Sequence, residues 1–68
     1  MFARELRQAG HTRRFIIHVR GTEGWEVREE QDEEILRRIC YTDWHRVERA
    51  LQVFTIRIGD LQATGWSD

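Results

Sequence analysis

The sequence predicts a small α+β domain in which a three-stranded antiparallel β-meander packs against one long C-terminal helix, a β-β-β-α unit. Two observations predict this class. Between residues 13 and 30, apolar and polar side chains alternate with the period of a β-strand. Further along, apolar residues recur every three or four positions, as on one face of a helix: Trp44, Val47, Leu51, Phe54, Ile58 and Leu61. This stripe needs an apolar surface to cover it, and the preceding sheet supplies one.

The first twelve residues are predicted to be a flexible or partly helical arm. Residues 2–9 favour helix and are followed by Gly10, but they are too few to hold a helix without packing. A single domain is then expected over residues 13–66, with residues 67–68 as a tail.

The first two predicted strands form a hairpin. Residues 13–20 are dense in β-branched and aromatic side chains, and residues 25–30 alternate cleanly. Between them, Gly21-Thr22-Glu23-Gly24 offers two residues that are free to adopt positive φ in a turn. The faces of these strands that are expected to meet the helix carry Phe15, Ile17, Val19, Trp25, Val27 and Glu29.

Residues 35–41 fit either a third strand or a helix. The acidic run 29–34 before them suits a second turn near Gln31-Asp32, because nothing in it favours burial. Ile35, Leu36, Ile39 and Cys40 also lie at helical spacing. We favour a strand, since an isolated two-stranded hairpin is marginal in water.

The helix is predicted over about residues 43–64. Thr42 can cap its free amides, and Asp43 places negative charge at the positive end of the helix dipole. Gly65 and Trp66 occupy the positions expected in a Schellman motif, in which Trp66 would contact Leu61. The β-branched content of residues 52–58 permits a strand there, but the longer helical spacing favours helix.

Composition indicates one small cytoplasmic domain without catalytic machinery. The chain has 68 residues and a formal charge of −1, and all eleven basic residues are arginine. A lone Cys40 argues for a reducing compartment, and no apolar run is long enough for a signal peptide or a membrane span. A core this small leaves a thin stability margin, which a partner would increase.

Apolar residues that the predicted core does not use suggest self-association, most simply as a homodimer. Val53 and Ile56 fall on the side of the helix away from the stripe, and Ile16 and Leu36 fall on the second face of the sheet. These four residues are the candidate interface.

The alternative is a nucleic-acid-binding module. The sheet face away from the helix would carry Arg14, Arg20, Arg28 and Arg38, which are the candidate nucleic-acid contacts. Carboxylates from Glu26, Glu30 and Glu34 would lie among them. These acids would neutralise the field that attracts nucleic acid, so we expect cross-strand ion pairs on this face.

No catalytic residue, metal ligand or cofactor is assigned. The residues with suitable side chains, His11, His18, Cys40 and His45, have no recurring metal-ligand spacing. Cys40 and His45 could form a thiolate–imidazole couple, but nothing in the sequence supplies an oxyanion hole.

From about Phe15 to Trp66 the chain resembles two groups of proteins. Gly24-Trp25-Glu26-Val27 opens the second strand, and a helix follows the third. This layout is similar to that of small bacterial β-β-β-α proteins of unknown function. It also resembles the arm-type DNA-binding modules of phage integrases and their relatives in plant ethylene-response factors. The first resemblance implies the β-β-β-α fold, and the second implies nucleic-acid binding through the sheet.

The sequence therefore predicts a non-catalytic self-associating or protein-interaction module, with nucleic-acid binding as the alternative.

Overall fold

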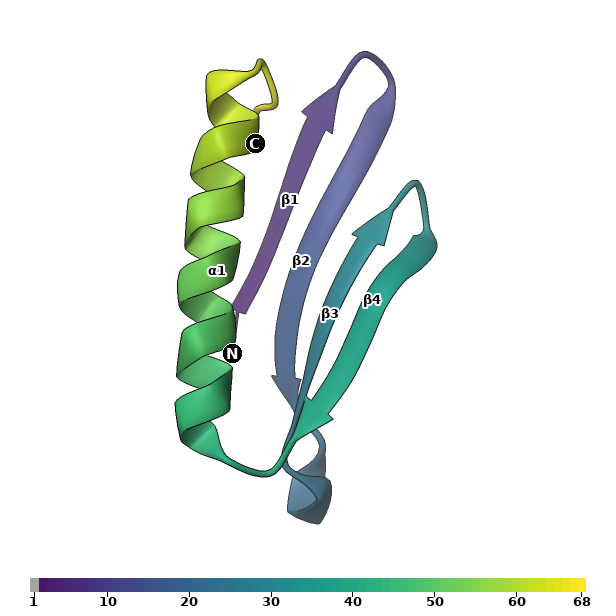
Figure 1. Cartoon of the computed structure of the whole chain (residues 1–68). Coiled ribbons are helices and arrows are strands. Elements are labelled where there is room, and N and C mark those ends of the chain that lie inside the picture. The colour runs from purple at the N-terminus through teal and green to yellow at the C-terminus, as the bar shows by residue number, and fades with distance from the viewer. Residues whose placement is uncertain (1) are drawn as a thin grey trace.

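The computed structural model describes residues 2–68, which form an antiparallel sheet of four strands followed by one C-terminal helix. The elements are β1 (Phe2–Gln8), β2 (His11–Val19), β3 (Trp25–Gln31), β4 (Glu34–Tyr41) and α1 (Trp44–Ala63), with a short 3-10 turn at Gly21–Glu23. The strands lie in the sheet in chain order (Figure 1). The predicted α+β class, antiparallel sheet and C-terminal helix are confirmed, but the sheet has four strands rather than three.

The additional strand is β1, which occupies most of the predicted N-terminal arm. It pairs with β2 from Phe2, opposite Ile17, to Gln8, opposite His11. Leu6 at its centre is fully buried. Helix propensities differ by less than about 1 kcal/mol per residue, whereas burying a leucine contributes roughly 2 kcal/mol. The prediction of a partly helical arm was wrong because tertiary packing outweighs the local preference.

Two-residue turns join β1 to β2 and β3 to β4. The φ angles are 50° and 81° at Ala9 and Gly10, and 51° and 71° at Asp32 and Glu33. Positive φ at both central residues is typical of a type I′ turn, whose twist matches that of the paired strands. The predicted second turn is confirmed, one residue later than expected.

The loop between β2 and β3 requires glycine at its end. Gly24 has φ 94°, and a Cβ atom placed on it would lie 2.2 Å from the backbone oxygen of Tyr41. The close approach of these two backbones brings the beginning of β3 beside the end of β4. The predicted β2–β3 hairpin is confirmed.

Residues 35–41 belong to β4, as favoured from the sequence. Arg37 is paired with Glu29, but the next residue of β3, Glu30, is paired with Ile35. Leu36 is therefore the extra residue of a β-bulge. The bulge moves Glu34 to the face that carries Leu6, although the sequence placed it on the opposite face.

α1 begins after Asp43, whose side chain caps it. Asp43 Oδ1 accepts a hydrogen bond of 2.9 Å from the backbone N–H of His45. The sequence assigned this role to Thr42, which instead precedes the cap. Asp43 also accepts backbone bonds from Arg46 and Val47, so the free amides of the first turn are largely satisfied.

α1 ends in the predicted Schellman motif. The N–H of Trp66 donates to the carbonyl of Leu61 at 3.0 Å, and that of Gly65 donates to Gln62 at 3.2 Å. Gly65 has φ 105°. The helix is continuous through residues 52–58, so the alternative of a strand there is excluded.

The core lies between α1 and one face of the sheet. Its buried apolar residues are Leu6, Phe15, Ile17, Val27, Val47, Phe54 and Ile58. The ring of Phe54 meets that of Phe15 edge-on, with centroids 5.0 Å apart. The helical stripe thus packs as predicted, except that Trp44 is about half exposed and lies against Trp25 at 5.2 Å. Val19, also expected in the core, is exposed.

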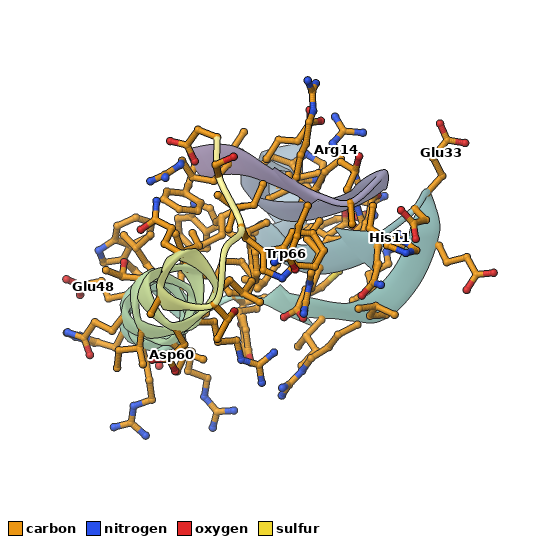
Figure 2. The ribbon with its side chains drawn as sticks, turned by 90° about the horizontal axis from the view of Figure 1, so that it is seen from above. His11, Arg14, Glu33, Glu48, Asp60 and Trp66 are labelled. Atoms are coloured by element: carbon orange, nitrogen blue, oxygen red, sulfur yellow. The ribbon has the colours of Figure 1, made fainter. Side chains whose placement is uncertain are left out.

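α1 crosses the sheet obliquely. Two residues connect its beginning to β4, whereas its end is held against β1. There Gln8 Nε2 donates to the carbonyl of Thr64 at 2.8 Å, and Arg7 exchanges two backbone hydrogen bonds with Ser67. α1 and β4 therefore diverge from their common connection (Figure 1). Trp66 lies between the end of the helix and the sheet (Figure 2).

Candidate functional site

A groove lies between α1 and β4, where these two elements diverge. Its apolar lining comes from two elements of the sheet and from α1: Val27, Ile39, Tyr41, Ala50, Val53 and Phe54. Its volume is about 460 Å³, which lies within the range of binding pockets. We call it the arginine groove, because four arginines also line it.

The four arginines come from both walls of the arginine groove. Arg37 extends from β4, and Arg46, Arg49 and Arg57 extend from α1. The three helical arginines lie on one side of α1 because they are separated by three and eight residues, close to whole turns. Arg37, Arg46 and Arg49 are exposed, and none of them has an ion pair or a side-chain hydrogen bond within residues 2–68.

The single acid in the lining, Glu29, is already compensated. It is 4% exposed and lies on the core face of β3. Arg57 Nη1 donates to its Oε1 at 2.6 Å, and Arg13 of β2 binds Oε2. Glu29 thus joins the helix to the sheet. Among the described residues 2–68, three positive charges of the arginine groove have no ion-pair partner, and they lie beside an apolar surface.

A second charged cluster lies on the opposite face of the sheet. Glu26 is 1% exposed, and it is covered by the cationic side chains that bind it: His18, Arg20, Arg28 and Arg38. We call these five residues the Glu26 cluster. The hydrogen bond from His18, together with Arg38 and Arg28, lowers the pKa of Glu26 to about 2, although burial alone would raise it.

The arginines proposed as nucleic-acid contacts share this face, as predicted. Arg20, Arg28 and Arg38 are all engaged by Glu26, and Arg14 lies between Glu5 and Glu30 at 3.5 and 3.7 Å. The expected cross-strand ion pairs are therefore present. Four acids, Glu5, Glu23, Glu26 and Glu30, are paired with these four arginines, so little net positive charge remains for phosphate groups on this face.

The four candidate interface residues do not form one surface. Val53 is 42% exposed and lines the arginine groove, and Ile56 on the same helix is 65% exposed. The cross-strand partner of Ile16, Arg28, places Ile16 beside the Glu26 cluster, on the far face of the sheet. Leu36 has no cross-strand partner, because it is the extra residue of the bulge in the edge strand β4. Leu36 is exposed there, whereas Ile16 is partly buried.

The histidines and the cysteine are dispersed. His18 binds Glu26, His11 lies 2.8 Å from Asp32, and His45 lies 3.6 Å from Glu48. Cys40 is exposed and shares the face of the Glu26 cluster. No group of three or more metal-ligating side chains occurs within residues 2–68, and no helix in that range is long and apolar enough to cross a membrane.

The sequence interpretation missed the arginine groove. Its signal was present, because Arg46, Arg49, Val53 and Arg57 recur along one flank of the apolar stripe. Whether that flank is covered depends on the angle between α1 and the sheet. The contacts between the helix end and β1 set this angle, and β1 was not expected to be a strand.

Comparisons with family models, with curated proteins and with solved structures gave no match.

Proposed function

We propose that the protein is a non-catalytic protein-interaction module, and that the arginine groove binds an acidic segment of a partner that also carries apolar side chains. The observation that supports this most directly is a set of three arginines, Arg37, Arg46 and Arg49, which border an apolar surface and have no ion pair in the described part of the chain, residues 2–68. Apolar side chains of the partner would cover the groove lining, while its carboxylates would pair with the guanidinium groups.

Charge favours a different protein over a second copy as the occupant. A symmetric dimer places the same surface patch of each copy against the other. Such a contact through the arginine groove would bring two sets of unpaired arginines together. The sequence favours a homodimer, but its four candidate residues lie on two faces, so we place the interaction with an acidic partner first.

The test is a selection, from a phage-displayed library of random twelve-residue peptides, of those that bind the immobilised protein. Enriched peptides should combine Asp or Glu with Leu, Ile, Val or Phe. A parallel selection against the Arg46→Glu/Arg49→Glu variant should lose this acidic preference. Selected peptides without an acidic bias, or with the same bias on both proteins, would contradict the proposal.

A quantitative measurement then uses one selected peptide, labelled for fluorescence anisotropy. Arg46→Ala/Arg49→Ala should weaken its binding about fivefold, because each exposed charge pair contributes roughly 0.5 kcal/mol. Arg7→Ala is the matched control, since Arg7 is exposed and lies outside the groove. Equal loss in both variants would indicate a non-specific charge effect.

Nucleic-acid binding through Arg14, Arg20, Arg28 and Arg38 is the second proposal. A labelled single-stranded oligonucleotide, titrated in place of the peptide, tests it. Direct binding that weakens as salt rises and that is lost in Arg14→Ala would favour this alternative.

A further inference from the structure

The open edge of the sheet borders the arginine groove. β4 pairs only with β3, and no other backbone group within residues 2–68 bonds to it. The opposite edge, β1, is partly covered because Ser67 bonds to Arg7. Every second residue of an edge strand directs its N–H and C=O groups away from the sheet, where they can pair with an added strand.

The same strand supplies one wall of the groove. The partners of Arg37, Ile39 and Tyr41 on β3 place all three on the core face, and all three line the groove. The β-bulge at Leu36 ends the regular ladder, so residues 37–41 form its regular part. A strand paired with this part would place alternate side chains beside Arg37, Ile39 and Tyr41.

We infer that the partner segment binds as an extended strand added to β4, with the pattern acidic–x–apolar–x–apolar on its groove side. This inference rests on the proposed function. The acidic residue lies beside Arg37, which has no ion pair within residues 2–68, and the apolar residues lie beside Ile39 and Tyr41. The intervening residues of the partner face the other side of the sheet. Arg38 on that side is already bound to Glu26, so these residues do not need to be acidic.

The direction of the added strand fixes the order of the pattern. Two ten-residue synthetic peptides therefore serve as probes, one with the core Asp-Thr-Val-Thr-Ile and one with the reversed core, each flanked by Gly and Ser. One of them should bind more tightly than the other in a fluorescence-anisotropy titration at low ionic strength. Equal binding by both peptides would overturn the strand assignment.

A scan of single backbone N-methyl groups along the tighter peptide tests the geometry. An N-methyl group removes a donor, so it should weaken binding at least tenfold at every second residue and less than twofold at the residues between. Charge exchange gives an independent check. Arg37→Glu should weaken the Asp peptide, and replacement of that Asp by Lys should restore binding to this variant.

The outcomes separate the two proposals. N-methyl effects without alternation would overturn the added strand, and the proposed function would still hold if Arg46→Ala/Arg49→Ala weakened binding. Binding that is indifferent to all the groove arginines would overturn both. Arg7→Glu, which reverses a charge outside the groove, serves as the control and should leave the affinity within twofold.

Discussion

At the scale of single residues, two buried carboxylates organise most of the buried charge. Glu29 lies on the core face and Glu26 on the outer face, and each is bound by cationic side chains from more than one element. A buried carboxylate without such partners would be strongly destabilising. Ion pairs with these two carboxylates hold five arginines in place: Arg13, Arg20, Arg28, Arg38 and Arg57. Among residues 2–68, a different set at the groove, Arg37, Arg46 and Arg49, stays free to bind a partner.

The Glu26 cluster predicts how stability depends on pH. The pKa of Glu26 is about 2 in the folded protein and 4.5 ordinarily. A lowered pKa means that the carboxylate stabilises the fold above pH 4.5 and that this stabilisation is lost as the pH falls toward 2. The free energy of unfolding, measured with urea, should decrease as the pH falls from about 5 toward 2.

Glu26→Gln tests the cause. This variant should lose about 2 kcal/mol at pH 7, as expected for hydrogen bonds to a charged group, and should show a shallower acid dependence. Some dependence remains because the backbone N–H of Thr12, with help from His11, also lowers the pKa of Asp32. An acid dependence as steep as that of the unmodified chain would contradict this account. Glu23→Gln, at an exposed site, is the control.

Glu33 is a site where substitution should increase stability. It has φ 71° in the β3–β4 turn, and this left-handed conformation costs a non-glycine residue roughly 1 kcal/mol. Glu33→Gly should therefore raise the free energy of unfolding by about 1 kcal/mol. Glu33→Ala removes the same charge but keeps the strained conformation, so a gain of equal size in both variants would assign the effect to charge.

At the scale of elements, β1 determines both the number of strands in the sheet and the position of the end of α1. It adds the fourth strand, contributes the fully buried Leu6, and holds the end of α1 through Gln8 and Arg7. A free arm would leave the core short of one large side chain and the helix end without these contacts.

Truncation of Leu6 tests whether β1 belongs to the folded unit. Leu6→Ala should lower the free energy of unfolding by about 3 kcal/mol, the usual cost of such a change in a core. Arg7→Ala, on the exposed side of the same strand, should change it by less than about 0.5 kcal/mol. Similar small effects in both variants, measured by urea denaturation, would show that β1 is not part of the cooperative unit.

Elements with a long, regular pattern could be predicted from the sequence. The stripe from Val47 to Leu61 and the Schellman positions Gly65 and Trp66 gave α1 within a residue or two, because helix period and capping are local properties. Residues 2–8 could not be assigned in this way, since only pairing with β2 makes them a strand.

The candidate site was harder to predict than the fold. The pairing of Glu26 with arginines on the outer face could be expected from strand alternation. The unpaired state of Arg37, Arg46 and Arg49 could not, because it depends on which carboxylates lie within reach in three dimensions.

At the scale of the whole molecule, a net charge of −1 conceals a strongly uneven distribution. Acids concentrate in residues 21–34, and the groove side of α1 and β4 is positive. Figure 2 shows Glu33 at the far end of the β3–β4 hairpin, well away from α1. Such separation favours oriented approach of an acidic partner.

Light scattering after gel filtration should distinguish the two forms of the interaction hypothesis. Because repulsion between the groove arginines of two copies opposes a symmetric contact, we expect the monomer mass of 8.2 kDa at micromolar concentrations. Twice that mass would support the homodimer favoured from the sequence. Leu36→Glu and Val53→Glu would then show which of the two faces mediates it.

The oblique helix is fastened at both ends, by the two-residue connection from β4 and by the contacts of the C-terminal residues with β1. The C-terminal end cannot swing outward without breaking its hydrogen bonds to β1, and the short connection restrains the other end. The angle between α1 and β4 therefore exists before any ligand arrives. Binding of the partner should consequently require little reorganisation of the protein and should proceed in one kinetic phase. Its association rate should depend on collision and ionic attraction rather than on opening of the protein.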